Sequence, residues 1–102
     1  MTTNQVRIVG LVASAPKQVT SAAGIPHTVL HLEHRSNQTQ AGMLRSVFCP
    51  IKVVVSGSHL QDACKRISSG SNVKVEGFLA WQQARDGSGK VMLHADSIEL
   101  IS

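Results

Sequence analysis

Basic and aromatic side chains lie close together at several points of this sequence. Such a combination suits a ligand that carries both negative charge and aromatic rings able to stack. Ten lysines and arginines stand against six acidic residues, which gives a formal net charge of +4 at pH 7. A phosphate backbone gains affinity from such charges by releasing its counterions, provided that the charges line one groove. The alternative is that they are solvated charges spread for solubility. The basic candidates are Lys17, Arg35, Arg45, Lys52, Arg85 and Lys90.

Aromatic rings are few, and each has a structural role that competes with binding. The chain contains Phe48, Phe78 and Trp81. In proteins that bind single strands, stacking on a base is worth about 1–3 kcal/mol. Phe48 is equally suited to stacking and to a core. Strict alternation along a strand places Trp81 on the face of Val73, in the core or a subunit interface, whereas a bulge at Gly77 would reverse the face and favour ligand contact. The sequence leaves both roles open.

Five histidines invite a metal-site interpretation, and their spacing argues against it. In a strand, His27 and His31 share a face but lie roughly 13 Å apart, and His31 and His34 point to opposite faces. Neither pair can chelate one ion, so we expect no metal site. No nucleophile stands beside a base, and no phosphate-cradling loop precedes a helix, so we expect no catalytic residues, no cofactor and no enzyme.

The cysteines and the start of the chain indicate the cellular setting. Cys49 and Cys64 have fourteen residues between them, a spacing that fits neither a metal pair nor a disulfide scaffold, so buried reduced thiols are expected. The first ten residues lack the pattern of a signal peptide, and the sequence has no apolar run of about 18 residues. We therefore expect a soluble, cytoplasmic protein.

Alternating apolar residues predict five strands, separated by segments rich in turn-forming residues. The polar residues 35–42 have no period and predict an exposed connection between the second and third strands. Pro50 cannot donate a hydrogen bond, so the third strand should have an edge stretch or a bulge there. Residues 85–90, RDGSGK, form the loop before the last strand, where glycines allow close approach to a partner. The predicted strands cover residues 5–12, 27–34, 44–55, 72–83 and 91–101.

One helix is predicted between the third and fourth strands, where Leu60, Cys64 and Ile67 fall on one apolar stripe. Ser58, with Gln61 three residues later, fits a capping box. This order is the topology of the oligonucleotide/oligosaccharide-binding (OB) barrel, so we expect an all-β, five-stranded OB fold in one domain, residues 1–102. Its binding surface should lie on the second and third strands, flanked by the loop after the first strand and the loop after the fourth.

Four stretches, AGIPHTVLHLEHRS, QAGMLRSVFCPIKVVVSG, VKVEGFLA and KVMLHADSIELI, together resemble the bacterial primosomal replication protein N (PriB) family, at corresponding spacing over nearly the whole chain. That family is similar to single-strand DNA-binding proteins. The resemblance implies a homodimer of OB folds that binds single-stranded DNA during replication restart. It also implies two protein partners, the restart helicase of the primosome (PriA) and the helicase-loading primosomal protein (DnaT).

The resemblance also assigns expected roles to individual residues. Phe48 occupies the position of the family's stacking tryptophan, and Met43 that of a second aromatic residue. The family's cationic contacts correspond to Arg35, Arg45, Arg85 and Lys90. Three positions depart from the family pattern: Gln83 replaces a third loop lysine, Val19 replaces a basic residue, and Trp81 stands where the family has a small residue. Weaker stacking and a smaller cationic surface are expected as a result.

Two hypotheses of different classes follow. The first is an accessory protein that binds single-stranded DNA without sequence specificity and bridges the restart helicase to the helicase-loading protein. The second is a protein-interaction adaptor in which nucleic-acid binding is weak or secondary, an alternative that the low aromatic content of 3% favours. RNA binding is a third possibility, because nothing in the sequence reads a 2′-hydroxyl.

Overall fold

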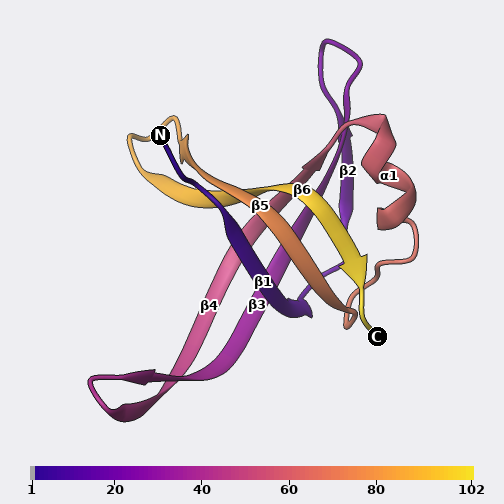
Figure 1. The fold of residues 1–102 in the computed structure, drawn as a ribbon. Helices are drawn as coiled ribbons and strands as arrows, with labels where there is room; N and C mark the ends of the chain where they lie inside the picture. Colours follow the sequence, from indigo (N-terminus) through magenta and orange to yellow (C-terminus); the bar gives the residue numbers. More distant parts are fainter. Residues whose placement is uncertain (1) are drawn as a thin grey trace.

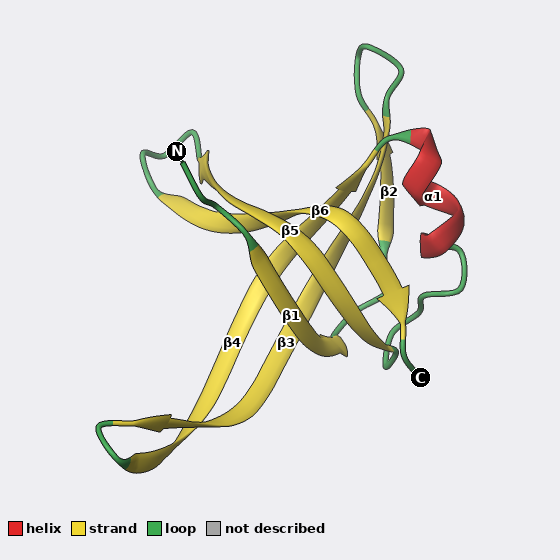
Figure 2. Ribbon diagram, in the orientation of Figure 1, coloured by secondary structure: helices red, strands yellow, loops and turns green. Residues whose placement is uncertain are grey.

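A computed structural model describes residues 2–102, in which six strands join into one sheet beside a single short helix (Figure 1, Figure 2). The strands run in the spatial order β1-β5-β6-β4-β3-β2, and β1 also pairs with β3, which closes the barrel. The elements are β1 (Val6–Val12), β2 (Lys17–Thr20), β3 (Pro26–Gln40), β4 (Met43–Ser56), α1 (Ser58–Cys64), β5 (Asn72–Gln83) and β6 (Gly89–Leu100).

The five predicted strands are present, and β1, β3, β4, β5 and β6 form the expected OB barrel. The additional short strand β2 was not predicted. It pairs antiparallel with the start of β3, from Lys17 opposite Val29 to Thr20 opposite Pro26. The helix therefore follows the fourth strand of the chain, although it still lies between the third and fourth strands of the barrel.

The predicted connection at residues 35–42 is wrong, because strand pairing continues through it. β3 and β4 pair without interruption from His27 opposite Ser56 to Gln40 opposite Met43. The turn consists of Ala41 and Gly42 alone, both with positive φ (53° and 75°), as a type I′ hairpin turn requires. Residues 35–48 thus form a hairpin that projects from the barrel, the β3–β4 arm, at the lower left of Figure 1.

The barrel interior is filled by aliphatic side chains from every strand of the barrel. Leu30 of β3, Val53 of β4, Val75 of β5 and Leu93 of β6 are fully buried, as is Val12 of β1. Each such burial stabilises the fold by about 1.5–3 kcal/mol. These residues mark the inward positions of each strand, so the residues that alternate with them define the outer face.

The Gln61 side chain ties helix α1 to the sheet by hydrogen bonds that were not predicted from the sequence. The N-cap residue is Gly57, and no side chain caps the helix, so the predicted capping box is wrong. Gln61 instead accepts a hydrogen bond from Thr28 Oγ1 (2.5 Å) and donates from Nε2 to the carbonyl oxygens of Val55 (3.1 Å) and Gly57 (3.0 Å). The helix ends before Ile67, which is nevertheless buried.

The two cysteines differ in environment. Cys64 is buried as expected, and desolvation raises the pKa of its thiol while a hydrogen bond with Thr28 opposes that change. Cys49 is only half-buried, which departs from the expectation, and the two thiols are not joined. Within residues 2–102, no helix is long and apolar enough to cross a membrane, and no group of three His, Cys, Asp or Glu side chains is placed to hold a metal ion.

A bulge lies opposite Gly77, but it does not change the face of the residues that follow on β5. Glu76 pairs with Ser97 and Gly77 with Ala95, so the extra residue is Asp96 of β6. A Cβ atom on Gly77 would lie 1.9 Å from the His94 carbonyl oxygen, so the backbones meet there only because the residue is glycine.

Pro50 shows the predicted edge character without a bulge. It pairs with Glu33 in an unbroken β3–β4 register. The second neighbour of β4 is β6, which pairs only with Lys52 to Val55. Pro50 therefore lies where β4 has a partner on one side, and its missing N–H donor is tolerated.

Candidate nucleic-acid interface

Strand pairing places five of the predicted site residues on one outer surface of the barrel. Directly opposed residues share a face, so Lys17 lies with Val29, and Arg35 lies with Phe48. Lys52 is opposed by His31 on one side and by Met92 on the other, and Lys90 precedes Met92 by two residues on the same face. We call this surface the cationic face and define it by Lys17, Arg35, Phe48, Lys52 and Lys90.

Arg35 and Phe48 form a cation–π pair at the base of the β3–β4 arm. The Arg35 Cζ atom lies 4.3 Å from the centroid of the Phe48 ring, and Phe48 is 53% exposed. The core role considered for Phe48 is therefore wrong. The two residues line a hollow with Asn37 and Ser46. The guanidinium group thus lies over one face of a half-exposed ring, an arrangement that suits a phosphate close to a stacked base.

Lys52 and Lys90 meet near the end of the β5–β6 hairpin. Lys52 Nζ donates a hydrogen bond to Gln82 Oε1 (3.1 Å), and Gln82 is directly opposite Lys90. Both lysines line a hollow with Glu33 and with Pro50 of β4. Lys90 belongs to β6 and not to the loop in which the sequence placed it. Strand pairing therefore holds the backbone from which the Lys90 ammonium group extends.

The lysines of this region lack carboxylate partners within 4.0 Å. Among residues 2–102, the ion pairs within 4.0 Å are Arg7–Glu76, Arg35–Glu33, Lys65–Asp62 and Lys74–Glu99. Lys17, Lys52 and Lys90 belong to none of them, and Arg35 reaches Glu33 only at 3.8 Å. Positive charge on the cationic face is therefore available to an outside anion.

An aromatic pair that was not predicted from the sequence lies on this same outer surface. Phe78 lies opposite His94, their rings stack at 5.2 Å with 15° between planes, and Phe78 is 41% exposed. His94 is in turn opposite Val54 of β4, two residues from Lys52. Strand alternation alone could place Phe78 on the outer face, but its pairing with His94 depends on the bulge at Asp96.

The structure does not bring Arg45 and Met43 onto the cationic face. They are opposite Gln38 and Gln40, on the other side of the β3–β4 arm from Arg35 and Phe48. Arg45 Nη1 donates to Gln40 Oε1 (2.9 Å), and Met43 is 72% exposed. The arm has solvent on both sides, so these residues are accessible only to a ligand that passes around it.

Trp81 and Arg85 belong to the end of the β5–β6 hairpin. Trp81 keeps the inward parity of Val75, yet it lies beyond the barrel and is 61% exposed, so a place in the core of the chain is wrong. Arg85 lies in the turn after β5. In that turn Asp86 Oδ1 accepts hydrogen bonds from the Ser88 amide (2.9 Å) and hydroxyl (2.6 Å), and these bonds lower the pKa of the Asp86 carboxyl.

Comparison with known proteins places these features in a family. A family described as "another single-strand binding protein family" matches residues 4–97. Replication restart protein PriB of Shewanella halifaxensis is 45% identical over 100 residues, covering 98% of each chain. The chain belongs to the PriB family of replication restart proteins. PriB of Photobacterium profundum is 46% identical over 99 residues, covering 97% of this chain and 95% of that protein. The resemblance seen in the sequence is thus confirmed.

Solved structures agree with the fold of a PriB-family chain. PriB of Ralstonia solanacearum superposes with a TM-score of 0.80 at 20% identity, covering 99% of this chain and 100% of that one. The single-stranded DNA binding protein of Thermus aquaticus gives a TM-score of 0.80 at 21% identity, covering 98% of this chain and 50% of that one. At such identities the likeness confirms the OB fold alone.

Proposed function

We propose that this chain binds single-stranded DNA without sequence specificity as a non-catalytic accessory protein of replication restart. One observation carries the proposal: lysines without carboxylate partners lie beside exposed aromatic rings on one face of a barrel of the single-strand-binding kind. The names of the relatives supply the setting of replication restart, which we place in the cytoplasm, with the chromosome.

We propose that different residues contact the phosphates and the bases of the bound strand. Lys17, Lys52 and Lys90 hold the phosphate backbone with Arg35, and Phe48 stacks on a base. The Phe78–His94 pair provides a second aromatic surface on β5 and β6, next to Lys52 on β4 and separated from Lys17 by β4 and β3. Because these contacts read charge and ring faces and no base edge, affinity is independent of sequence. Arg45, Met43 and Arg85 add contacts where the strand passes around the arm and the hairpin turn.

The protein partners are part of the same proposal. The chain acts as a homodimer and bridges the restart helicase PriA to the helicase-loading protein DnaT. A free strand edge supports dimer formation: β1 pairs with β5 from Val6 to Leu11, whereas it pairs with β3 only at Leu11 and Val12. Such an open edge is a template for pairing with another chain.

Salt titration tests the binding function. We expect the fluorescence anisotropy of labelled oligo-dT to report binding that weakens steeply with salt, with a slope of about −3 in log K against log salt for four neutralised phosphates. The physical reason is release of condensed counterions. Affinity that stays constant between low and moderate salt would contradict the proposal.

The adaptor hypothesis remains the second candidate, and the aromatic content of only 3% favours it. An adaptor binds PriA equally well with and without DNA, and its affinity for oligo-dT is weak at every salt concentration. Pull-down of PriA with and without oligo-dT separates the two functions. Competition between matched DNA and RNA strands decides the preferred polymer, because no residue of the cationic face selects the sugar.

A further inference from the structure

Trp81 is held in a fixed orientation on an open surface. Its indole Nε1 donates to Gln83 Oε1 (2.9 Å), and Gln83 Nε2 donates to the Gly87 carbonyl oxygen (2.9 Å) in the hairpin turn. A Cβ atom on Gly89 would lie 2.2 Å from the Trp81 Cζ2 atom, so the indole lies directly against the glycine backbone. The ring is thus supported on one side and tied at its nitrogen while 61% of the residue remains exposed.

This ring lies on the opposite side of the β5–β6 hairpin from the lysines. Trp81 and Gln83 have inward parity, as do Val91 and Gly89 opposite them, whereas Gln82 and Lys90 have outward parity. A hollow of about 360 Å³ at the end of the hairpin is lined by Lys52 and Lys90 and also by Gln83 and Gly89, the two residues that contact the indole. A strand that follows this hollow from the cationic face around the end of the hairpin would arrive next to the indole.

We propose that Trp81, Gln83 and Gly89 form a preorganised base-stacking platform, and that a bound single strand passes around the β5–β6 hairpin to reach it. This inference rests on the proposed function and adds a second contact site on the reverse side of the hairpin. A rigid indole loses little conformational freedom on binding, so stacking contributes more fully to affinity. Gly89 and Gln83 act as positioning residues, since neither needs to touch the base.

The test uses the emission of Trp81 itself. Trp81 is the single tryptophan of the chain, which has no tyrosine, so fluorescence excited at the red edge reports on this ring alone. We expect oligo-dT to change the emission in step with the anisotropy of the labelled strand. Trp81→Ala should weaken binding on the order of 10-fold, with the salt slope unchanged because no phosphate contact is lost, and Trp81→Phe should restore most of that loss.

Two further variants test the positioning residues. Gly89→Ala displaces the indole and Gln83→Leu removes its hydrogen bond, so both should reduce the emission change and weaken binding several-fold while Trp81 is retained. Ile101→Ala, an exposed apolar residue just beyond the other end of β6, is the matched control and should bind as the wild type does. If Gly89→Ala fails to fold, the comparison of Trp81→Ala with Trp81→Phe decides.

The possible failures are distinguishable. Oligo-dT that binds with normal salt dependence but leaves the Trp81 emission unchanged overturns the platform and leaves the proposed function intact. Emission that changes with protein concentration in the absence of DNA, and not with oligo-dT, shows that a second copy covers the ring and also overturns the platform. Absence of any oligo-dT binding overturns both proposals.

Discussion

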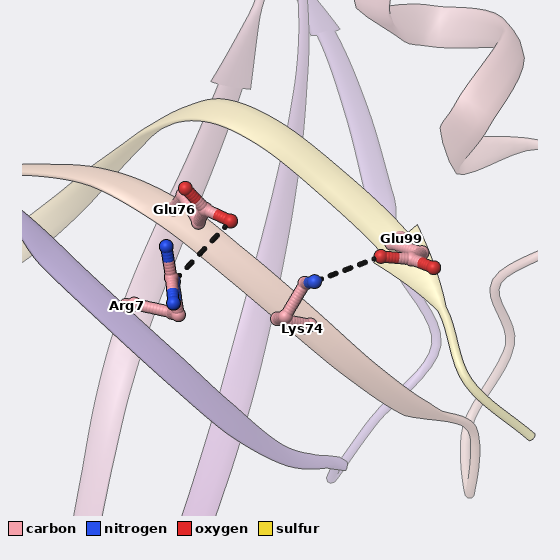
Figure 3. A network of polar contacts seen from close by, with 4 residues as sticks. All are labelled: Arg7, Lys74, Glu76 and Glu99. Atoms are coloured by element: carbon pink, nitrogen blue, oxygen red, sulfur yellow. Dashed lines mark ion pairs between the residues drawn. The ribbon is translucent and has the colours of Figure 1, made fainter.

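Two regions of the outer surface differ in whether their basic residues have carboxylates directly opposite them on the neighbouring strand. On the strands drawn in Figure 3, Arg7 Nε lies 3.4 Å from Glu76 Oε1, and Lys74 Nζ lies 3.1 Å from Glu99 Oε2. These pairs follow the strand register, since each cation is directly opposite its carboxylate. On the cationic face the residues opposite the cations are neutral: Val29 for Lys17, Phe48 for Arg35, and Gln82 for Lys90.

The difference shows how a chain with a net charge of only +4 can still leave several lysines without carboxylate partners on one face. Exposed ion pairs contribute about 1 kcal/mol or less to stability, so the pairs of Figure 3 matter mainly because they neutralise one side of the molecule. Net charge is then concentrated where the cross-strand partners are uncharged. The positions of the six carboxylates, and not only the count of lysines and arginines, therefore determine where positive charge is left unpaired.

The largest expected effect comes from removing charge on each region in turn. The double variant Lys52→Gln, Lys90→Gln should weaken oligo-dT binding on the order of 10- to 100-fold and reduce the salt slope by about 1.4, because two phosphate contacts are lost. The measurement is a salt series of anisotropy titrations. The matched control, Arg7→Gln with Lys74→Gln, removes the same formal charge from the paired region and should change the affinity less than 2-fold. Equal losses in the two variants would show that net charge alone governs binding.

A smaller effect is expected from the aromatic half of the cationic face. Phe48→Ala should weaken oligo-dT binding on the order of 10-fold, since one stacking contact is lost, while the salt slope changes little. Phe48→Trp should bind more tightly than the wild type because its π-surface is larger. Since Phe48 is half-exposed, thermal melting should show that both variants remain folded. A loss of affinity that exactly tracks a loss of fold would assign Phe48 to packing.

The smallest effect concerns the carboxylate in the hairpin turn. Hydrogen bonds from Ser88 favour the charged form of Asp86, so its carboxyl should titrate by NMR below the ordinary aspartate pKa. A depressed pKa means that this group favours the folded turn above the unfolded-state pKa, and that the contribution is lost as pH falls through the folded value. Asp86→Asn should tighten oligo-dT binding about 2-fold by removing repulsion of phosphate near Arg85. Asp62→Asn on α1 is the control and should leave affinity unchanged.

Much of the fold follows from local patterns, and the failures have physical causes. Strands were predictable where inward residues alternate with polar ones, as Val73 and Val75 of β5 do with Lys74 and its neighbours. The strand at residues 35–40 was not predicted, because the arm has water on both sides and its sequence therefore shows no alternation of apolar and polar residues. The capping box failed because Gln61 faces Thr28 and the carbonyl groups of the sheet, a tertiary arrangement that spacing within the helix cannot reveal.

For the candidate site, residue types were predictable and faces were not. Alternation from Val73 gave Trp81 its correct parity, but the inference that inward parity means burial was wrong because β5 and β6 extend past the barrel. The separation of Arg45 from Arg35 required the β3–β4 register. The Phe78–His94 stack required knowledge that Asp96 is the extra residue of the bulge.

The central claim, that single-stranded DNA binds the face whose lysines lack carboxylate partners, is tested most directly by mapping the bound strand on the protein. The measurement is the change in backbone amide NMR shifts on adding oligo-dT. The account predicts that the largest changes cluster around Arg35, Phe48, Lys52 and Lys90, with little change at Arg7 and Lys74. Changes centred on Arg7 and Lys74 would contradict it.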